Sequence, residues 1–162
     1  LCDEFKLSIA VSPRVQQLAA DINACNAVAV HFRCFDNHKQ EHKYHSVGSC
    51  YYRDALQTIL RLTAYPHFFV FSDDLAQARD HFIHLGLEAT FVDTAREQDS
   101  DLIDLWLMTQ CRSYIIANST FSWWAAWLSQ SNDKIVIAPG LECTGVGAWG
   151  FDGLIPDSWI VI

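Results

Sequence analysis

Short apolar runs alternate with longer amphipathic segments along this chain of 162 residues. The runs are apolar at nearly every position, which is typical of strands buried on both faces of a sheet, and they lie at residues 27–32, 68–72, 89–92, 114–117 and 134–138. Between them, apolar residues recur at helical spacing, at residues 13–25, 51–63, 75–85, 101–110 and 120–130. The alternation predicts an α/β fold in which helices flank a Rossmann-like parallel sheet.

Local signals support several of these boundaries. Ser12 followed by Pro13 is a favourable helix start, and Gly86 is a typical helix end. A last short element is expected within residues 158–162, after a Gly-rich loop. Because the sequence contains no repeat and no low-complexity linker, we expect residues 1–162 to form a single domain.

One predicted strand is followed directly by polar residues that open the next helix. The run at 114–117 leads into Asn118, Ser119, Thr120 and Ser122. Ligands of such sheets bind beyond the carboxyl ends of the strands, and the first turn of a helix offers unpaired, partly positive N–H groups. The sequence therefore predicts a phosphate-binding helix start, with an ordinary N-cap as the alternative.

The helix after this start carries three tryptophans, Trp123, Trp124 and Trp127, which we expect to anchor it against the sheet. Residues 118–120 also match the acceptor pattern for N-glycosylation. Since no secretory leader precedes them, we regard that match as accidental.

A second polar group follows the predicted strand at 27–32. Arg33 offers a planar fork that suits a phosphate, and His31 alternates with it and faces the same side. The alternative is an exposed arginine that pairs with Asp36. Two sets of candidate phosphate-binding residues, each at the end of a strand of the same sheet, favour one shared site.

Composition limits the partners. The formal net charge is −8 and no stretch is strongly basic, which argues against nucleic-acid binding but leaves a small phosphorylated ligand open. No apolar run is long enough to span a membrane. The six cysteines include no C-x-x-C pair, so we expect free thiols in a reducing compartment.

A series of segments in fixed order resembles the α-1,2-fucosyltransferase family. They read VHFRCFD, SCYYRDAL, FFVFSDD, DLWLMTQC, IIANSTFSWWAAWL and KIVIAP, within residues 27–159. The family motif His-x-Arg-Arg-Gly-Asp-Tyr is matched at His31, Arg33 and Asp36. It is not matched at Cys34, at Phe35 and at Asn37.

The resemblance implies transfer of L-fucose from GDP-fucose to a galactoside hydroxyl, with inversion and without a metal. It implies that this chain is the donor-binding half of a two-domain GT-B-type enzyme whose N-terminal half is absent here. Arg33 would hold the donor phosphate, and Asp36 would orient Arg33 or act as a base. We expect a cytoplasmic enzyme, with peripheral membrane association as an open alternative.

One acidic residue suits the guanine base. Asp104 interrupts an apolar stretch and matches the acidic position of the family's D-x-x-L-M pattern, and one carboxylate can accept both the N1–H and the 2-amino group of guanine. The alternative places Asp104 on a wet helix face together with Asp101. Asp73 is the next candidate, and the pair Asp73-Asp74 is the nearest thing to a metal-binding acidic pair.

Two other functions stay open. Ligand types that zinc favours cluster in one loop, at Cys34, His38, His42, His45 and Cys50, although their spacing matches no standard zinc site. The chain could also be a nucleotide-binding domain that has kept the fold and lost transfer activity.

Overall fold

The computed structural model describes residues 11–34, 47–140 and 153–162. Within these ranges the strands are β1 (Asn26–Phe32), β2 (Pro66–Ser72), β3 (Ala89–Phe91), β4 (Ser113–Ile115), β5 (Ile135–Ala138) and β6 (Ile160–Val161). The helices are α1 (Pro13–Asn23), α2 (Ser49–Leu62), α3 (Leu75–His84), α4 (Ser100–Thr109) and α5 (Thr120–Leu128). The strands form one parallel sheet in the order β3-β2-β1-β4-β5-β6, so the predicted Rossmann-like fold is confirmed.

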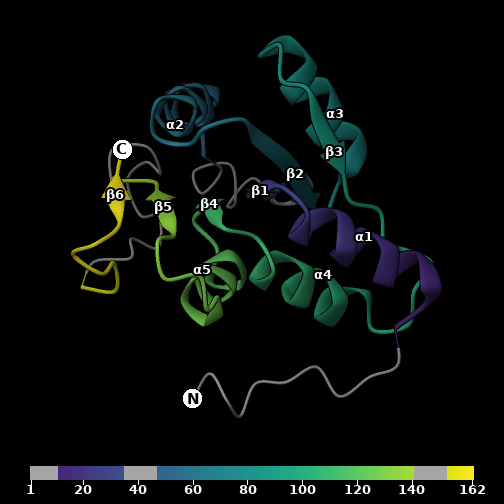
Figure 1. Cartoon of the computed structure of the whole chain (residues 1–162). Helices are drawn as coiled ribbons and strands as arrows, with labels where there is room; N and C mark the ends of the chain where they lie inside the picture. The colour runs from purple at the N-terminus through teal and green to yellow at the C-terminus, as the bar shows by residue number, and fades with distance from the viewer. Residues whose placement is uncertain (1–10, 35–46, 141–152) are drawn as a thin grey trace.

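The helices form two layers around the sheet. Figure 1 shows α1, α4 and α5 on one face and α2 and α3 on the other. In β1, Ala27 and Ala29 pack into the core beneath the first group of helices, and Val28 and Val30 pack into the core beneath the second. All four side chains are fully buried, which explains why this strand is apolar at successive positions.

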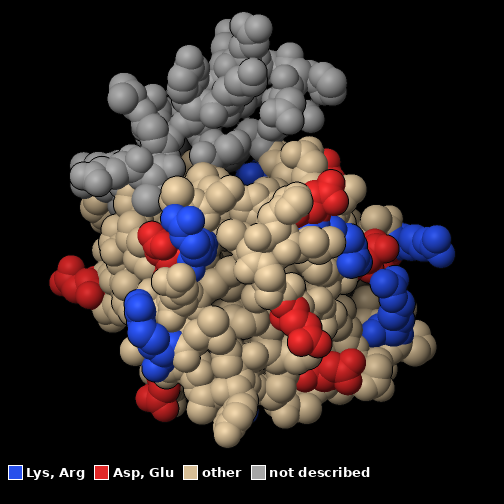
Figure 2. All heavy atoms as spheres, turned by 90° about the horizontal axis from the view of Figure 1, so that it is seen from above, with Lys and Arg blue, Asp and Glu red and all other residues tan. Residues whose placement is uncertain are grey.

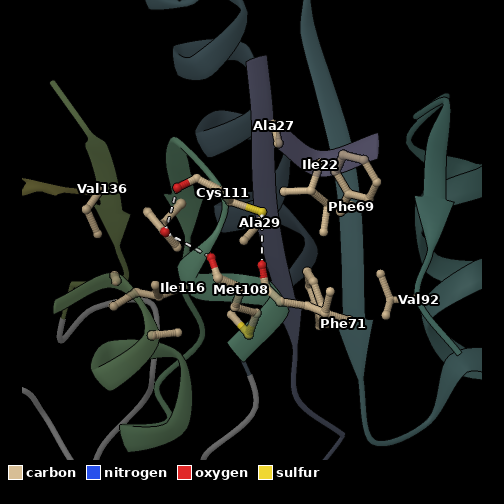
Figure 3. Close-up of a cluster of buried hydrophobic side chains, with 14 of the residues drawn as sticks. Ile22, Ala27, Ala29, Phe69, Phe71, Val92, Met108, Cys111, Ile116 and Val136 are labelled. Carbon is tan, nitrogen blue, oxygen red and sulfur yellow. Dashed lines mark hydrogen bonds between the residues drawn. The ribbon is translucent and has the colours of Figure 1, made fainter. Parts of the chain in front are cut away.

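The core beneath α1, α4 and α5 combines small and large side chains. Ala27 and Ala29 leave room for Phe69 and Phe71 of β2, and Met108 of α4 fills the space beside them (Figure 3). Such interdigitation brings the helices close to the sheet.

Two buried tyrosines of α2 join this helix to the backbone of the sheet region. The Tyr51 hydroxyl lies 2.7 Å from the carbonyl oxygen of Ile116 and 2.9 Å from that of Ile137. The Tyr52 hydroxyl donates to the carbonyl oxygen of His31 at 3.0 Å. Because these carbonyls are buried, the hydroxyl groups supply partners that water cannot.

The helix boundaries follow the capping signals, with small differences. The Ser12 side chain accepts a hydrogen bond from the Val15 N–H as the N-cap of α1, and Gly86, at φ 68°, follows α3. Helix α4 begins one residue earlier than expected, after Asp99 at φ 57°. The short terminal element is confirmed as β6.

The expectation for the tryptophans of α5 is wrong in part. Trp123 packs against the core and donates its indole N–H to the Leu154 carbonyl at 3.0 Å. Trp124 and Trp127 are 42% and 44% exposed, although Trp127 stacks on Trp123. The reason is that the fully buried residues Ala125 and Ala126 face the sheet, so close approach leaves the large rings outside.

Surface charge is mixed on the face seen in Figure 2, where basic and acidic side chains are interspersed among uncharged ones. Cys25, Cys34, Cys50 and Cys111 are free thiols. Cys2 and Cys143 lie outside the described residues, as does most of the Gly-rich loop. Among the helices described, none has both the length and the apolarity needed to span a membrane.

Candidate functional site

The carboxyl ends of β1 and β2 bring Arg33 and Asp73 together. The two strands are in register up to Phe32 and Ser72, so the next residues leave the sheet side by side. Arg33 Nη1 lies 2.8 Å from Asp73 Oδ2, and the Cys34 N–H donates to Asp73 Oδ1 at 2.8 Å. Asp73 therefore holds both the arginine head and the backbone that follows it.

This ion pair is partly open to solvent. The side chains of Arg33 and Asp73 are 41% and 30% exposed. Pairs with this exposure contribute about 1 kcal/mol or less to stability, so the pair's main effect is to orient the guanidinium. A guanidinium carries five N–H donors, more than one carboxylate can engage, and it is therefore suited to hold a phosphate as well.

His31 lies buried beside the start of α5. Its ring centroid is 5.6 Å from that of Phe121, and the residue is only 5% exposed. Burial, assisted by the positive charge of Arg33, lowers the pKa of His31 to about 3. The ring is thus neutral at ordinary pH, and its Nδ1 has no hydrogen-bond partner among the described residues.

The start of α5 is not closed by a serine side chain. Ser119 is the N-cap residue, yet its hydroxyl makes no capping hydrogen bond. Thr120 is exposed, and Asn118 is 8% exposed. Ser122 is fully buried and donates its hydroxyl to the Ser119 carbonyl at 3.2 Å. Its backbone N–H belongs to the first turn of α5, where N–H groups have no partner within the helix.

Asp74 has a different task from Asp73. Its carboxylate caps α3, accepting hydrogen bonds from the Gln77 backbone N–H at 2.9 Å and the Gln77 side-chain amide at 2.8 Å. These hydrogen bonds lower the pKa of Asp74. Both members of the acidic pair are therefore engaged with protein groups.

Asp104 is held by a residue of the loop that follows β3. The Thr94 hydroxyl donates to Asp104 Oδ1 at 2.7 Å. Burial, with smaller contributions from Asp101 and Asp93, raises the pKa of Asp104 to about 6. Asp101 is exposed, so Asp104 does not simply share its wet face. Thr94 was not predicted from the sequence, although the polar pair Asp93-Thr94 follows an apolar strand as the other site residues do.

Some of the remaining predicted site residues lie outside the described ranges. Asp36, expected to orient Arg33 or to act as a base, lies outside the described residues, as do His38, His42 and His45 of the zinc alternative. Of that set, Cys34 and Cys50 are described: Cys50 is an exposed free thiol in the first turn of α2, and burial raises the pKa of the Cys34 thiol to about 11. Cys34 is therefore a neutral thiol in this environment.

Comparisons with known proteins agree on one family. The chain is 36% identical over 138 residues to the O-antigen biosynthesis glycosyltransferase WbnK of Escherichia coli, covering 83% of this chain and 44% of that protein. It is 32% identical over 139 residues to an alpha-1,2-colitosyltransferase of Escherichia coli, covering 84% and 48%. The chain thus spans about half the length of the curated relatives it matches.

Solved structures agree with the fold. The fucosyltransferase NodZ from Bradyrhizobium matches with a TM-score of 0.57 at 22% identity, over 82% of this chain and 44% of that chain. A NodZ alpha-1,6-fucosyltransferase soaked with GDP-fucose matches with a TM-score of 0.53 at 19% identity, over 84% and 47%. The model of Glycosyl transferase family 11 matches residues 1–142. The chain therefore belongs to glycosyl transferase family 11.

Proposed function

We propose that this chain is the donor-binding part of a glycosyltransferase that moves L-fucose from GDP-fucose to a galactoside hydroxyl, forming an α-1,2 linkage with inversion. The observation that carries the proposal is Arg33, held by Asp73 at the carboxyl edge of the sheet, the edge at which α5 also begins. Such an edge is where ligands of parallel sheets bind.

The comparisons support the donor and the linkage to different degrees. One curated relative is an alpha-1,2-colitosyltransferase, which supports the α-1,2 linkage and makes colitose an alternative transferred sugar. The NodZ structure soaked with GDP-fucose supports the donor, while its own linkage is alpha-1,6. Direct comparison of GDP-fucose and GDP-colitose as donors would decide which sugar is used.

The diphosphate would be bound by Arg33 and by the first turn of α5. Negative charge builds on the leaving phosphate as the bond to the sugar breaks, so donors aimed there stabilise the transition state. The backbone N–H groups of the turn from Ser119 to Ser122 are suited to this, since no side chain caps them in the manner of an ordinary N-cap. Neutral His31, buried beside Phe121, would offer a further polar contact.

The guanine base would be recognised by Asp104. In the N-terminal half of α4, the residue lies toward the carboxyl edge, since the helix following a parallel strand begins at that edge. An ionised carboxylate accepts both adjacent donors of guanine, and adenine offers no such pair. We therefore expect GDP to bind more tightly than ADP.

We propose no metal for the reaction. Asp73 pairs with Arg33 and Asp74 caps α3, so both acids already serve other groups. Transfer should survive EDTA in the complete enzyme. Loss with EDTA and recovery with manganese would instead assign Asp73 or Asp74 as metal ligands.

The acceptor contacts are assigned to the other half of a two-domain GT-B-type enzyme, while Asp36 of this chain stays a candidate to orient Arg33 or to act as a base. This assignment is motivated by the chain's span, which is 44% and 48% of its two curated relatives. The same reasoning makes that other half the main protein partner of this chain, with a galactoside glycan as the acceptor.

Parallel titrations with GDP and with zinc, together with a transfer assay, distinguish the transferase from the two alternative functions. A nucleotide-binding domain without transfer would bind GDP, yet the complete enzyme would not release GDP from GDP-fucose with a galactoside present. A metal module would bind zinc tightly and GDP weakly. GDP binding, weak zinc binding and galactoside-dependent turnover together support the transferase.

A further inference from the structure

We propose that Thr94 is a positioning residue, whose hydroxyl holds the Asp104 carboxylate in the orientation that receives the guanine base. The inference rests on the proposed function, in which Asp104 binds guanine. Its own observation is the 2.7 Å hydrogen bond from Thr94 Oγ1 to Asp104 Oδ1.

Thr94 is fixed before it reaches Asp104. The residue is only 4% exposed, and its carbonyl accepts the Glu97 N–H at 2.8 Å. The same loop is tied to α1 twice, because Arg14 Nη2 donates to the Asp93 carbonyl at 2.8 Å and Ser12 donates to Glu97 Oε1 at 2.9 Å. These contacts fix the position of the loop that carries the Thr94 hydroxyl.

A hydrogen bond to one carboxylate oxygen limits rotation of the whole group. Within the described ranges, Thr94 is the residue that hydrogen bonds to Asp104, and it engages Oδ1. Oδ2 and the second lone pair of Oδ1 then point in directions set by that bond. Guanine presents two donors at a fixed spacing, so a carboxylate with fixed rotation loses less entropy on binding.

The Thr94 hydrogen bond also opposes the effect of burial and of nearby carboxylates on the pKa of Asp104. Burial and the nearby carboxylates of Asp101 and Asp93 raise the pKa of Asp104 to about 6, while the Thr94 hydroxyl acts in the lowering direction. Guanine N1–H and the 2-amino group need an acceptor, which is the ionised carboxylate. Thr94 thus helps to keep Asp104 in the binding form as well as in the binding orientation.

Two substitutions separate the hydroxyl from the shape of the side chain. Thr94→Val keeps the volume and removes the donor, and Thr94→Ser keeps the donor. Thr109→Val is the matched control, because Thr109 in the same helix as Asp104 donates a 2.7 Å bond to the Trp106 carbonyl and does not contact Asp104. Each variant of the chain is titrated with GDP and with ADP between pH 5.5 and pH 8.

A second measurement needs no nucleotide. The Asp104 carboxyl carbon is followed by carbon-13 NMR through a pH titration of each variant. Thr94→Val should move the Asp104 midpoint upward by about one unit, since loss of a hydrogen bond to the charged form disfavours that form. Thr94→Ser and Thr109→Val should leave the midpoint near the wild-type value.

In the nucleotide titrations, Thr94→Val should weaken GDP binding about tenfold at pH 7, the scale of one charge-assisted hydrogen bond, while ADP binding changes less than about twofold. The GDP loss should be larger at pH 6, and Thr94→Ser should restore most of the affinity. An unchanged GDP-to-ADP preference in Thr94→Val, or a Ser variant as weak as the Val variant, would overturn the positioning role.

Failure of the proposed function has a different signature. If the wild type shows no preference for GDP, or if Asp104→Asn keeps the preference, guanine recognition by Asp104 is contradicted and the role of Thr94 falls with it. If Asp104→Asn loses the preference while Thr94→Val keeps it, only the inference about Thr94 is overturned.

Discussion

The Arg33 guanidinium lies 2.8 Å from the Asp73 carboxylate, one position beyond the last register pair of β1 and β2. The same carboxylate accepts the Cys34 N–H. Two strands that are distant in sequence thereby define where the arginine points. This contact orients Arg33 through Asp73, while the orienting role expected for Asp36 stays a prediction because Asp36 lies outside the described residues.

Removing Asp73 should weaken nucleotide binding without abolishing it. In Asp73→Ala, Arg33 keeps its charge and loses this ion pair, so GDP affinity should fall by about twofold to fivefold, the equivalent of about 1 kcal/mol or less. Calorimetry with GDP measures the change. Asp54→Ala is the control, because Asp54 pairs with an arginine on an exposed surface. Equal affinity in Asp73→Ala and the wild type would contradict the orienting role.

His31 should make the fold sensitive to acid. Its folded pKa of about 3 lies below the ordinary value of 6.5. The stability that depends on neutral His31 is therefore complete above about pH 6.5 and is lost as the pH falls toward 3. Wild-type stability should drop across that window, and His31→Phe should drop less, by up to about 3 kcal/mol at pH 4.

Urea unfolding at a series of pH values tests this prediction. His67→Phe controls for loss of an exposed histidine. Parallel pH profiles for the wild type and His31→Phe would show that His31 is not the buried group responsible.

Asp104 should have the opposite effect on stability. Its folded pKa of about 6 lies above the ordinary 3.8, so its contribution is greatest below about pH 4 and is lost as the pH rises through 6. Asp104→Asn still offers an oxygen to Thr94 and does not titrate. It should therefore stabilise the fold at pH 7.5 by about 2 kcal/mol and give little at pH 4.

Denaturant titrations at the two pH values measure the effect, with the exposed Asp101→Asn as control. Destabilisation by Asp104→Asn at pH 7.5 would contradict the burial of an unfavourable charge. Stabilisation together with lost GDP preference would show that the residue is kept for binding at a cost to the fold.

Lys134 should stabilise the end of α5. Its Nζ donates to the carbonyl oxygens of Ala126 at 2.8 Å, Trp127 at 3.2 Å and Ser129 at 2.8 Å. The positive charge also complements the negative end of the helix. Lys134→Met should lower the free energy of unfolding by about 1.5–3 kcal/mol. Arg53→Met, at an exposed ion pair, should cost far less, and equal losses would contradict the capping role.

The sheet was predictable because its strands are buried on both faces. Val28 and Val30 pack into one core while Ala27 and Ala29 pack into the other, so the apolar run by itself predicts a buried strand. The helix α1 was equally predictable, since Ser12 caps it in the predicted way. Local chemistry and burial agree in these segments.

The contacts within the site were less predictable because they join segments distant in sequence. Arg33 and Asp73 are brought together by register, and Thr94 reaches Asp104 across a loop. The large tryptophan side chains of α5 were expected to be buried against the sheet. Instead, the small residues Ala125 and Ala126 face the sheet and set the distance between the helix and the sheet. A hydrophobic pattern does not show which side chains must be small for close approach.

The central claim is that Arg33 holds the diphosphate of a guanine nucleotide at the carboxyl edge of the sheet. Calorimetric titration of GDP into the wild type, Arg33→Ala and Arg33→Lys tests it most directly, with Arg53→Ala as the matched surface control. Arg33→Ala should weaken GDP binding by about thirtyfold or more, and Arg33→Lys should recover little, because one ammonium cannot replace a bidentate fork. Equal GDP affinity in the wild type and Arg33→Ala would contradict the account.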